Sequence, residues 1–283
     1  MWVELVAVVL ILGLLVWLIV AVTMKKRTSQ MARTLQKIRN TDGPRADISD
    51  IVDLVLVIAI PKRKEYITQA LKTYGLHPGS YQFVDTVMKD DLEANNVPWH
   101  MTSGEVACYK SHMRAVQQLV DSGASTGLIF EDDLKQCPDY DLFQRRLGEL
   151  KRELQWLIEG WDIIYFGRCN DTCMMNKQVS EQLVKNTSPI CLHAYMLSRR
   201  GAQKLVKYVS QEPGVPIDVV FMKLILTGKM RSLSVSPSLF YQNKDIGTTV
   251  GNPRELRECL MDNHDWYKEQ SKRVHPTSLI LPI

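Results

Sequence analysis

The longest apolar stretch of the chain lies at its N-terminus, where residues 5–22 carry no charged or polar side chain. About 17 to 20 consecutive apolar residues are enough to cross a bilayer as a helix. A cleaved signal peptide would place lysine or arginine before a shorter apolar core, but the charged residue before this stretch is Glu4. The pattern therefore predicts a transmembrane anchor over residues 1–23, followed by a polar, basic stem over residues 24–50.

Farther along the chain, apolar runs of strand length alternate with amphipathic stretches of helical length. Expected strands cover residues 53–60, 81–87, 127–130, 161–167, 190–198, 231–235 and 238–242. Expected helices cover residues 62–74, 102–122, 143–158 and 200–209, and a last helix opens at residue 216. Thr102 and Glu105 form a capping-box pattern at the start of the central helix. The alternation predicts one α/β domain over residues 51–283, Rossmann-like and with a mostly parallel sheet.

The formal net charge of +4 is concentrated next to the apolar stretch. Residues 24–47 hold seven Lys or Arg and two Asp, so residues 48–283 are close to neutral. A basic segment beside a membrane span attracts anionic lipid headgroups. The charge therefore predicts a lipid bilayer as a partner of the stem and gives no support for nucleic-acid binding.

Sequence signals disagree on the side of the membrane that the domain occupies. The positive-inside tendency places the basic stem, and with it the domain, in the cytosol. Two glycosylation sequons, which begin at Asn170 and Asn186, have meaning only in a secretory lumen. A loop closed by a Cys169–Cys173 disulfide would require an oxidising compartment, whereas a zinc site there lacks a second cysteine pair. The sequence predicts a single-pass membrane protein with the side left open.

The densest chemical signal is a row of three acids, Glu131, Asp132 and Asp133, directly after the expected strand at residues 127–130. Ligands of open α/β sheets bind beyond the carboxyl ends of the strands. Adjacent carboxylates repel one another, so the row favours a cation, and on an extended backbone Glu131 and Asp133 share one side. A hard divalent ion that bridges to nucleotide phosphates is the natural ligand. A solvated acidic turn is the simpler alternative.

Around these acids, the sequence resembles glycosyltransferase family 25. The resemblance rests on six blocks that occur in the family's order and cover most of residues 53–250. The blocks are Gly104-Glu105-x-x-Cys108-x-x-Ser111-His112, Phe130-Glu131-Asp132-Asp133, Trp161-Asp162-Ile163-Ile164-Tyr165-Phe166-Gly167-Arg168, Ala194-Tyr195-x-x-Ser198-x-x-Gly201-Ala202-x-x-Leu205, Pro216-Ile217-Asp218 and Pro237-Ser238-Leu239-Phe240-x-Gln242. The long stretch over residues 130–168 is most similar to the procollagen galactosyltransferase branch. One departure is clear, because Ala59 stands where the family's first strand usually carries an asparagine.

The resemblance implies a GT-A type nucleotide-sugar-binding domain that transfers a hexose, galactose above all, from a UDP-sugar. The acceptor would be a hydroxyl of a glycan, glycolipid or glycoprotein, the cofactor Mn²⁺ or another divalent cation, and the reaction inverting. Negative charge grows on the β-phosphate of the leaving nucleotide. A metal held by Asp133, with Glu131 as helper, would neutralise that charge.

The resemblance also suggests roles for residues in the other blocks. Asp132, Arg168 and Gln242 are expected on the donor side, with Asp132 next to the ribose or behind the metal ligands. The acceptor hydroxyl needs a base, for which Asp218 is the candidate; an acid of a helix's first turn is its structural alternative. His112 lies on the capped helix and is expected either to border the site or to make a structural hydrogen bond.

The sequence is also compatible with two other functions. It identifies neither the acceptor nor whether the transferred hexose is galactose or glucose. A strand followed by acids also suits a metal phosphohydrolase. A non-catalytic, sugar-binding or scaffold relative would keep the fold. Ala59 is compatible with that alternative, because it replaces the asparagine that the family usually carries. Consumption of a UDP-hexose that requires an acceptor would separate the transferase from the hydrolase.

Overall fold

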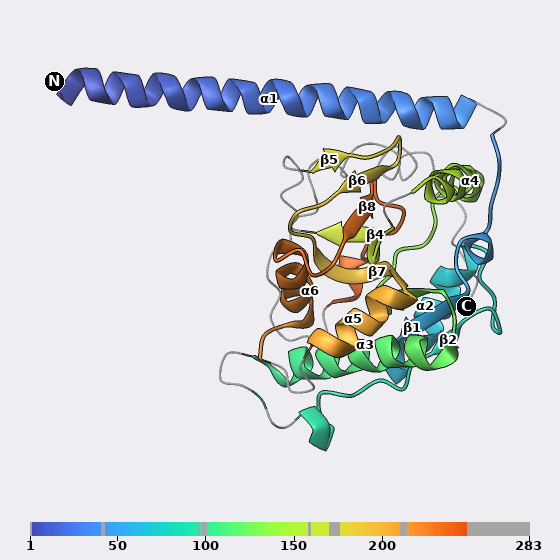
Figure 1. Ribbon diagram of the computed structural model, residues 1–283. Coiled ribbons are helices and arrows are strands. Elements are labelled where there is room, and N and C mark those ends of the chain that lie inside the picture. The colour runs from blue at the N-terminus through green and yellow to red at the C-terminus, as the bar shows by residue number, and fades with distance from the viewer. Residues whose placement is uncertain are drawn as a thin grey trace, which may run out of the picture.

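An eight-stranded sheet forms the centre of the computed structural model, and the long N-terminal helix α1 runs above it in Figure 1. The described residues are 2–40, 43–94, 97, 101–157, 160–169, 176–209 and 214–247. The sequon at Asn170, Cys173 and residues 248–283 therefore lie outside the described part of the chain.

The strands of the sheet stand in the order β2-β1-β3-β7-β4-β8-β6-β5. Their bounds are β1 (Leu54–Ile58), β2 (Gln82–Phe83), β3 (Thr126–Glu131), β4 (Ile163–Cys169), β5 (Lys177–Gln178), β6 (Leu183–Lys185), β7 (Ile190–Ser198) and β8 (Ser232–Val235). β1 pairs in parallel with β2 and β3, and β4 pairs in parallel with β8. The remaining four pairs are antiparallel. The sheet is mixed, so the expectation of a mostly parallel sheet is wrong.

The passage from β4 to β7 explains this difference. A parallel neighbour requires a crossover of about a dozen residues or more, usually containing a helix. Between β4 and β7 the described residues contain the short strands β5 and β6 and no helix, and β7 returns beside β4 in the opposite direction. Because β7 is antiparallel to both β3 and β4, the carboxyl ends of β3 and β4 lie at the same edge of the sheet.

Helices cover both faces of the sheet in a three-layer arrangement. α2 (Lys64–Lys72) and α4 (Tyr140–Gln155) pack on one face. α3 (Ser103–Ser122), α5 (Arg199–Tyr208) and α6 (Ile217–Leu226) pack on the other, and Figure 1 shows α3 and α5 side by side. Short 3-10 helices complete the described elements: η1 (Ile48–Asp50), η2 (Pro61–Arg63), η3 (Leu92–Ala94) and η5 (Lys244–Ile246).

The start and end of α3 follow directly from the sequence. Thr102 Oγ1 accepts a hydrogen bond from Glu105 N at 3.1 Å, and the Glu105 carboxylate accepts one from Thr102 N at 2.8 Å. The predicted capping box is thus confirmed. Gly123 ends the helix with a φ of 77°, a left-handed conformation that glycine adopts without strain. These two signals fix where α3 begins and ends, while its buried residues, such as Tyr109 and Val116, set the face that meets the sheet.

The N-terminal helix α1 (Trp2–Asn40) is continuous over 39 residues. Its segment Val6–Thr23 is exposed, apolar and long enough to cross a membrane, a test of length and composition that a signal sequence also passes. The helix then continues through the basic residues, so the first part of the predicted stem is helical. Near its end, Ile38 is buried with Leu142 of α4 and with Tyr241, while the apolar half projects past the domain in Figure 1.

A disulfide joins β4 to β7 through Cys169 and Cys191, whose Cα atoms are 5.6 Å apart. The predicted Cys169–Cys173 loop is therefore wrong. Antiparallel pairing places Cys169 opposite Ile190, which brings the adjacent Cys191 within disulfide distance. The second sequon is buried: Asn186 is 3% exposed and donates a hydrogen bond to Ser234, so the folded domain leaves no room for a glycan there.

Candidate active site

The three acids at the end of β3 point to three different parts of the molecule. β3 ends at Glu131 and residues 132–133 form a turn, so the alternation that predicts a common side for Glu131 and Asp133 stops before Asp133. Glu131 contacts α3, Asp132 contacts the residues after β1, and Asp133 contacts the residues after β8. The acids remain close neighbours because they are consecutive, but their partners differ.

Glu131 is paired with a buried histidine of α3. His112 Nε2 donates to Glu131 Oε1 at 2.9 Å, and His112 Nδ1 lies 2.9 Å from the hydroxyl of Tyr195 on β7. His112 and Tyr195 are fully buried. Burial by itself raises the pKa of Glu131, but the hydrogen bond and charge of His112 bring the pKa below its usual value. Glu131 is therefore held as a carboxylate facing α3.

Asp132 is held by a buried ion pair with Arg63. Its carboxylate accepts from Arg63 Nη1 at 3.0 Å and from Ile60 N at 2.9 Å. Arg63 Nη2 also donates to the carbonyls of Ile246 and Gly247, at 3.1 and 2.7 Å. Burial raises the pKa of Asp132, and the bonds from Ile60 and Arg63 offset part of that rise. The pair ties the end of β3 to the end of β1 and to the residues after η5.

Asp133 is the acid whose bonding is incomplete. Gln242 Nε2 donates to Asp133 Oδ2 at 3.1 Å, while Asp133 Oδ1 is buried and accepts no hydrogen bond from any described residue. Burial, followed by the charges of Glu131 and Asp132, raises the pKa of Asp133 well above its usual value. A buried carboxylate oxygen without a donor, next to two other acids, fits the oxygen-rich ligand set of a hard divalent cation.

Asp218 lies in the first turn of α6, close to this group. Its carboxylate accepts from Val219 N at 2.8 Å, and a backbone hydrogen bond from Cys191 also reaches it. Burial raises the pKa of Asp218, the charge of Glu131 raises it further, and the charge of His112 lowers it. The predicted base is thus a first-turn acid and also an electrostatic neighbour of the cluster at the end of β3.

The structure separates the other two donor-side candidates. Gln242 reaches the acids through its bond to Asp133, although the expected strand at residues 238–242 is reduced to a single bridge between Gln242 and Leu134. Arg168 is 3% exposed, and its Nη1 donates to the carbonyl of Val235 on β8 at 3.0 Å. Its contact with a donor phosphate stays a prediction.

Sequence reasoning missed three residues that the fold brings to the site. Cys108 of α3 has its Sγ within 4.8 Å of ligand atoms of His112 and Glu131, and the four-residue spacing of Cys108 and His112 was the available signal. His193 of β7 is buried, and its Nδ1 makes no hydrogen bond with any described residue. Burial lowers the pKa of His193, although the nearby negative charge of Glu131 raises it in part. Neither His193 nor Arg63 carried a distinguishing sequence pattern.

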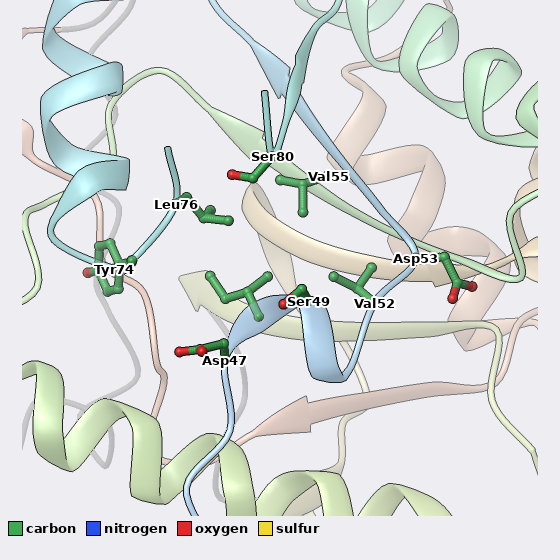
Figure 2. Close-up of a pocket in the computed structure, with 10 residues that line it drawn as sticks. Asp47, Ser49, Val52, Asp53, Val55, Tyr74, Leu76 and Ser80 are labelled. Carbon is green, nitrogen blue, oxygen red and sulfur yellow. The ribbon is translucent and has the colours of Figure 1, made fainter. Parts of the chain in front are cut away.

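A separate hollow lies beside the amino end of β1, away from the acids that follow β3, and Figure 2 shows the residues that line it. Residues just before and at the start of β1, such as Val52 and Val55, form one wall, and Tyr74 and Leu76 form another. None of the predicted site residues lines it. The chemistry-bearing side chains gather instead at the carboxyl ends of β1 and β3.

The comparison with protein families decides what kind of domain carries this site. Residues 55–221 match the description "Glycosyltransferase family 25 (LPS biosynthesis protein)". The chain belongs to this family. The matched residues include all three acids and Asp218, and they end before Gln242.

Curated relatives resemble parts of the family 25 chain. It is 28% identical over 199 residues to "Procollagen galactosyltransferase 1" of Danio rerio, which covers 62% of this chain and 32% of that protein. It is 34% identical over 126 residues to "Glycosyltransferase 25 family member" of Aedes aegypti, 43% of this chain and 20% of that protein. It is 31% identical over 192 residues to "Inactive glycosyltransferase 25 family member 3" of Mus musculus, and the matched residues make up 59% of this chain and 31% of that protein. The chain spans about a third or less of these relatives' length.

Proposed function

We propose that this protein is a membrane-anchored, cation-dependent hexosyltransferase that moves galactose from a UDP-sugar to an acceptor hydroxyl. The observation that carries the proposal is the buried Oδ1 of Asp133, which accepts no hydrogen bond from any described residue and lies beside two other acids. This oxygen belongs to a family 25 domain, at the edge of the sheet where open α/β folds bind ligands.

Asp133 and Glu131 are the proposed ligands of the cation, Mn²⁺ or another hard divalent ion. Such an ion supplies positive charge where negative charge grows on the leaving diphosphate. Gln242 holds Oδ2 of Asp133, which would leave Oδ1 free to bind the ion. Carboxylate orientation of this kind commonly changes metal affinity by about 10- to 100-fold.

Asp218 is the proposed base for the acceptor hydroxyl. A carboxylate whose pKa is raised toward the working pH accepts a proton more readily than an ordinary surface acid, and burial raises the pKa of Asp218 in this way. The backbone bonds from Val219 and Cys191 fix the carboxylate while α6 packs on the sheet. A hydroxyl placed between Asp218 and the donor carbon would lose its proton as the new glycosidic bond forms, with inversion at that carbon.

Asp132 and Arg168 complete the proposed donor side of a GT-A type nucleotide-sugar site. Asp132 acts through the buried pair with Arg63, which keeps the ends of β1 and β3 together. Arg168 adds a buried positive charge near the end of β4. A guanidinium there would favour the diphosphate group of the donor.

The same proposal places the domain in a secretory lumen. Disulfides persist in oxidising compartments, and the Cys169–Cys191 bond lies within the domain. The apolar segment of α1 supplies a single-pass anchor, and in this proposal the disulfide outweighs the positive-inside tendency of the basic residues that follow the anchor. Glycoprotein and glycolipid acceptors are available in that compartment.

A non-catalytic, sugar-binding relative is the second candidate function. Two observations favour it: the likeness to a mouse family member named as inactive and Ala59 at the position of the family's asparagine. Such a protein would bind a UDP-sugar without turning it over, and loss of Asp133 would leave its cellular role intact.

Turnover of a panel of UDP-hexoses by the detergent-solubilised full chain separates these functions. We expect UDP release from UDP-galactose only with an acceptor and Mn²⁺, and loss of release on addition of a chelator. Binding without turnover would support the non-catalytic relative. Acceptor-free hydrolysis of simple phosphate esters would identify a phosphohydrolase, and UDP release that needs no cation would contradict the role of Asp133.

A further inference from the structure

A second group of metal-ligand side chains lies on α3, beside the proposed transferase site. Cys108 and His112 are four residues apart, so they project from the same face of the helix, and Glu131 meets them from the end of β3. Ligand atoms of these three residues all lie within 4.8 Å of one another. These residues are called the α3 cluster below.

The ligand atoms of the α3 cluster suit one class of ion. Thiolate, imidazole and carboxylate together favour Zn²⁺, whereas Mg²⁺ and Mn²⁺ prefer oxygen ligands. Bond lengths of about 2.0 to 2.3 Å in a tetrahedral zinc site place ligand atoms about 3.3 to 3.7 Å apart. Atoms that already lie within 4.8 Å need only small side-chain rotations to reach that spacing.

Tyr195 already holds the histidine in the orientation that a zinc ligand needs. Its hydroxyl is 2.9 Å from Nδ1 of His112, which leaves Nε2 facing Glu131. A metal-bound histidine almost always bonds through its other ring nitrogen to a fixed partner. A neutral imidazole that binds zinc through Nε2 carries its one proton on Nδ1, from which it can donate to the Tyr195 hydroxyl, which can also accept.

The charges around the thiol also favour a cation. Burial raises the pKa of Cys108, and the charges of Glu131, Asp218, Asp133 and Asp132 raise it further. An ion that enters the α3 cluster therefore meets a negative potential. On binding, the thiol releases its proton to solvent and the ion compensates the thiolate charge.

We propose that the α3 cluster is a zinc site with Cys108, His112 and Glu131 as protein ligands and a fourth position for water. It is distinct from the all-oxygen cation site centred on Asp133, and the two sites share Glu131, whose carboxylate has two oxygens. The zinc site locks the contact between α3 and the end of β3, and so fixes Glu131 for its neighbour.

Cobalt substitution tests this proposal without any transferase assay. Co²⁺ is titrated into the metal-stripped full chain in detergent, and a near-ultraviolet thiolate-to-cobalt charge-transfer band is expected that excess Zn²⁺ removes. Cys108→Ser should abolish the band, while Cys137→Ser, the matched control at the other free cysteine of the described chain, should leave it. Asp133→Asn should also leave it, so failure of the zinc site and failure of the proposed transferase are distinguishable.

Three results would overturn the zinc site: no band in the wild-type chain, a band that survives Cys108→Ser, or a band lost equally in Cys137→Ser. A second measurement covers a variant that fails to fold. In the wild-type chain, Zn²⁺ is expected to slow alkylation of Cys108 by about 10-fold or more relative to Mn²⁺ and to leave Cys137 unchanged. Equal alkylation rates of Cys108 with both ions would contradict the proposal.

Discussion

Asp162 and Asp133 lie at opposite edges of the same sheet. Asp162 immediately precedes β4, whereas Asp133 follows the end of β3, and β3 and β4 run in the same direction on either side of β7. Asp162 accepts hydrogen bonds from Lys204 Nζ at 2.6 Å, Arg200 Nε at 2.9 Å and Arg231 N at 2.8 Å. Asp133 accepts one side-chain bond and keeps a buried oxygen without a donor among the described residues.

The two acids consequently differ in the direction of their pKa shifts. Burial by itself raises the pKa of Asp162, but the bonds from Lys204, Arg231 N and Arg200 bring it below its usual value. At Asp133, burial and neighbouring acids raise the pKa well above its usual value. A buried acid whose oxygens accept several charged or backbone hydrogen bonds stabilises the fold. A buried acid with an oxygen that lacks a donor gains more free energy when a cation binds to it. Asp162 thus belongs to a satisfied structural network at the start of β4, and Asp133 after β3 is the acid to which we assign the proposed chemistry.

The largest expected effect is the loss of transfer on Asp133→Asn. An amide in place of the carboxylate removes the proposed cation ligand and the charge compensation on the leaving diphosphate, for which about 10²- to 10³-fold in kcat is expected. The variant should unfold at the same or higher urea concentration than the cation-free wild type, because a poorly compensated buried acid has been removed. Asp90→Asn, at an exposed aspartate, is the matched control. Unchanged UDP release by Asp133→Asn would contradict the proposal that Asp133 binds the cation.

Asp162→Asn tests the opposite edge and is expected to act on stability. The loss of charge-assisted bonds to Lys204, Arg200 and the Arg231 amide should lower the free energy of unfolding by about 2 to 3 kcal/mol. Both cationic side chains can turn to solvent, so a larger loss is not expected. Urea unfolding at fixed detergent concentration measures the change, and kcat of the folded fraction should stay within about 2-fold of wild type. A fall in kcat without a fall in stability would show that the two edges are not separable.

Gln242→Ala should give a smaller effect in the same direction as Asp133→Asn. Without the amide, Asp133 Oδ2 loses its donor and the carboxylate can rotate, so the Mn²⁺ concentration needed for half-maximal activity is expected to rise about 10-fold. Saturating Mn²⁺ should restore most of kcat. Gln117→Ala, at a glutamine that bonds Asp121 on an exposed helix face, is the control. If saturating Mn²⁺ restores nothing, Gln242 contacts the donor directly.

Local sequence signals predicted the elements better than their assembly. The capping box at Thr102 and the bounds of β7 follow from short-range patterns, and both are confirmed. The antiparallel insertion of β7 depends on β5 and β6, which span only two and three residues, too few to show a period of two. The Cys169–Cys191 disulfide depends in turn on that insertion, so it could not be read from cysteine spacing.

The same limit applies to the candidate site. The row of acids was visible in the sequence, but the directions of its side chains were not, because a turn replaces the strand at Asp132. His112 was considered as a residue that borders the site, whereas Cys108 was missed although its four-residue spacing from His112 was an available signal. Their meeting with Glu131 is a tertiary contact between α3 and β3. Residue types and local spacing were therefore predictable, and the partner of each side chain was not.

The smallest expected effect is on the pH dependence of stability, where the two acids should act in opposite directions. The folded-state pKa of Asp133 is raised, so the cation-free folded protein binds its proton more tightly than the unfolded chain, and this acid adds stability as pH falls from the raised value toward its usual value. The folded-state pKa of Asp162 is lowered, so its contribution is complete above its usual value and is lost as pH falls through the lower folded value. Urea unfolding across acidic pH measures both effects. Asp133→Asn should remove the pH dependence of stability above the usual aspartate pKa (the upper window), and Asp162→Asn should remove the dependence below it (the lower window). Mn²⁺ should suppress the upper window alone, because the ion competes with the proton for Asp133. If Mn²⁺ leaves the upper window unchanged in the wild-type chain, Asp133 does not hold the cation and the contrast between the two edges reduces to a difference in burial.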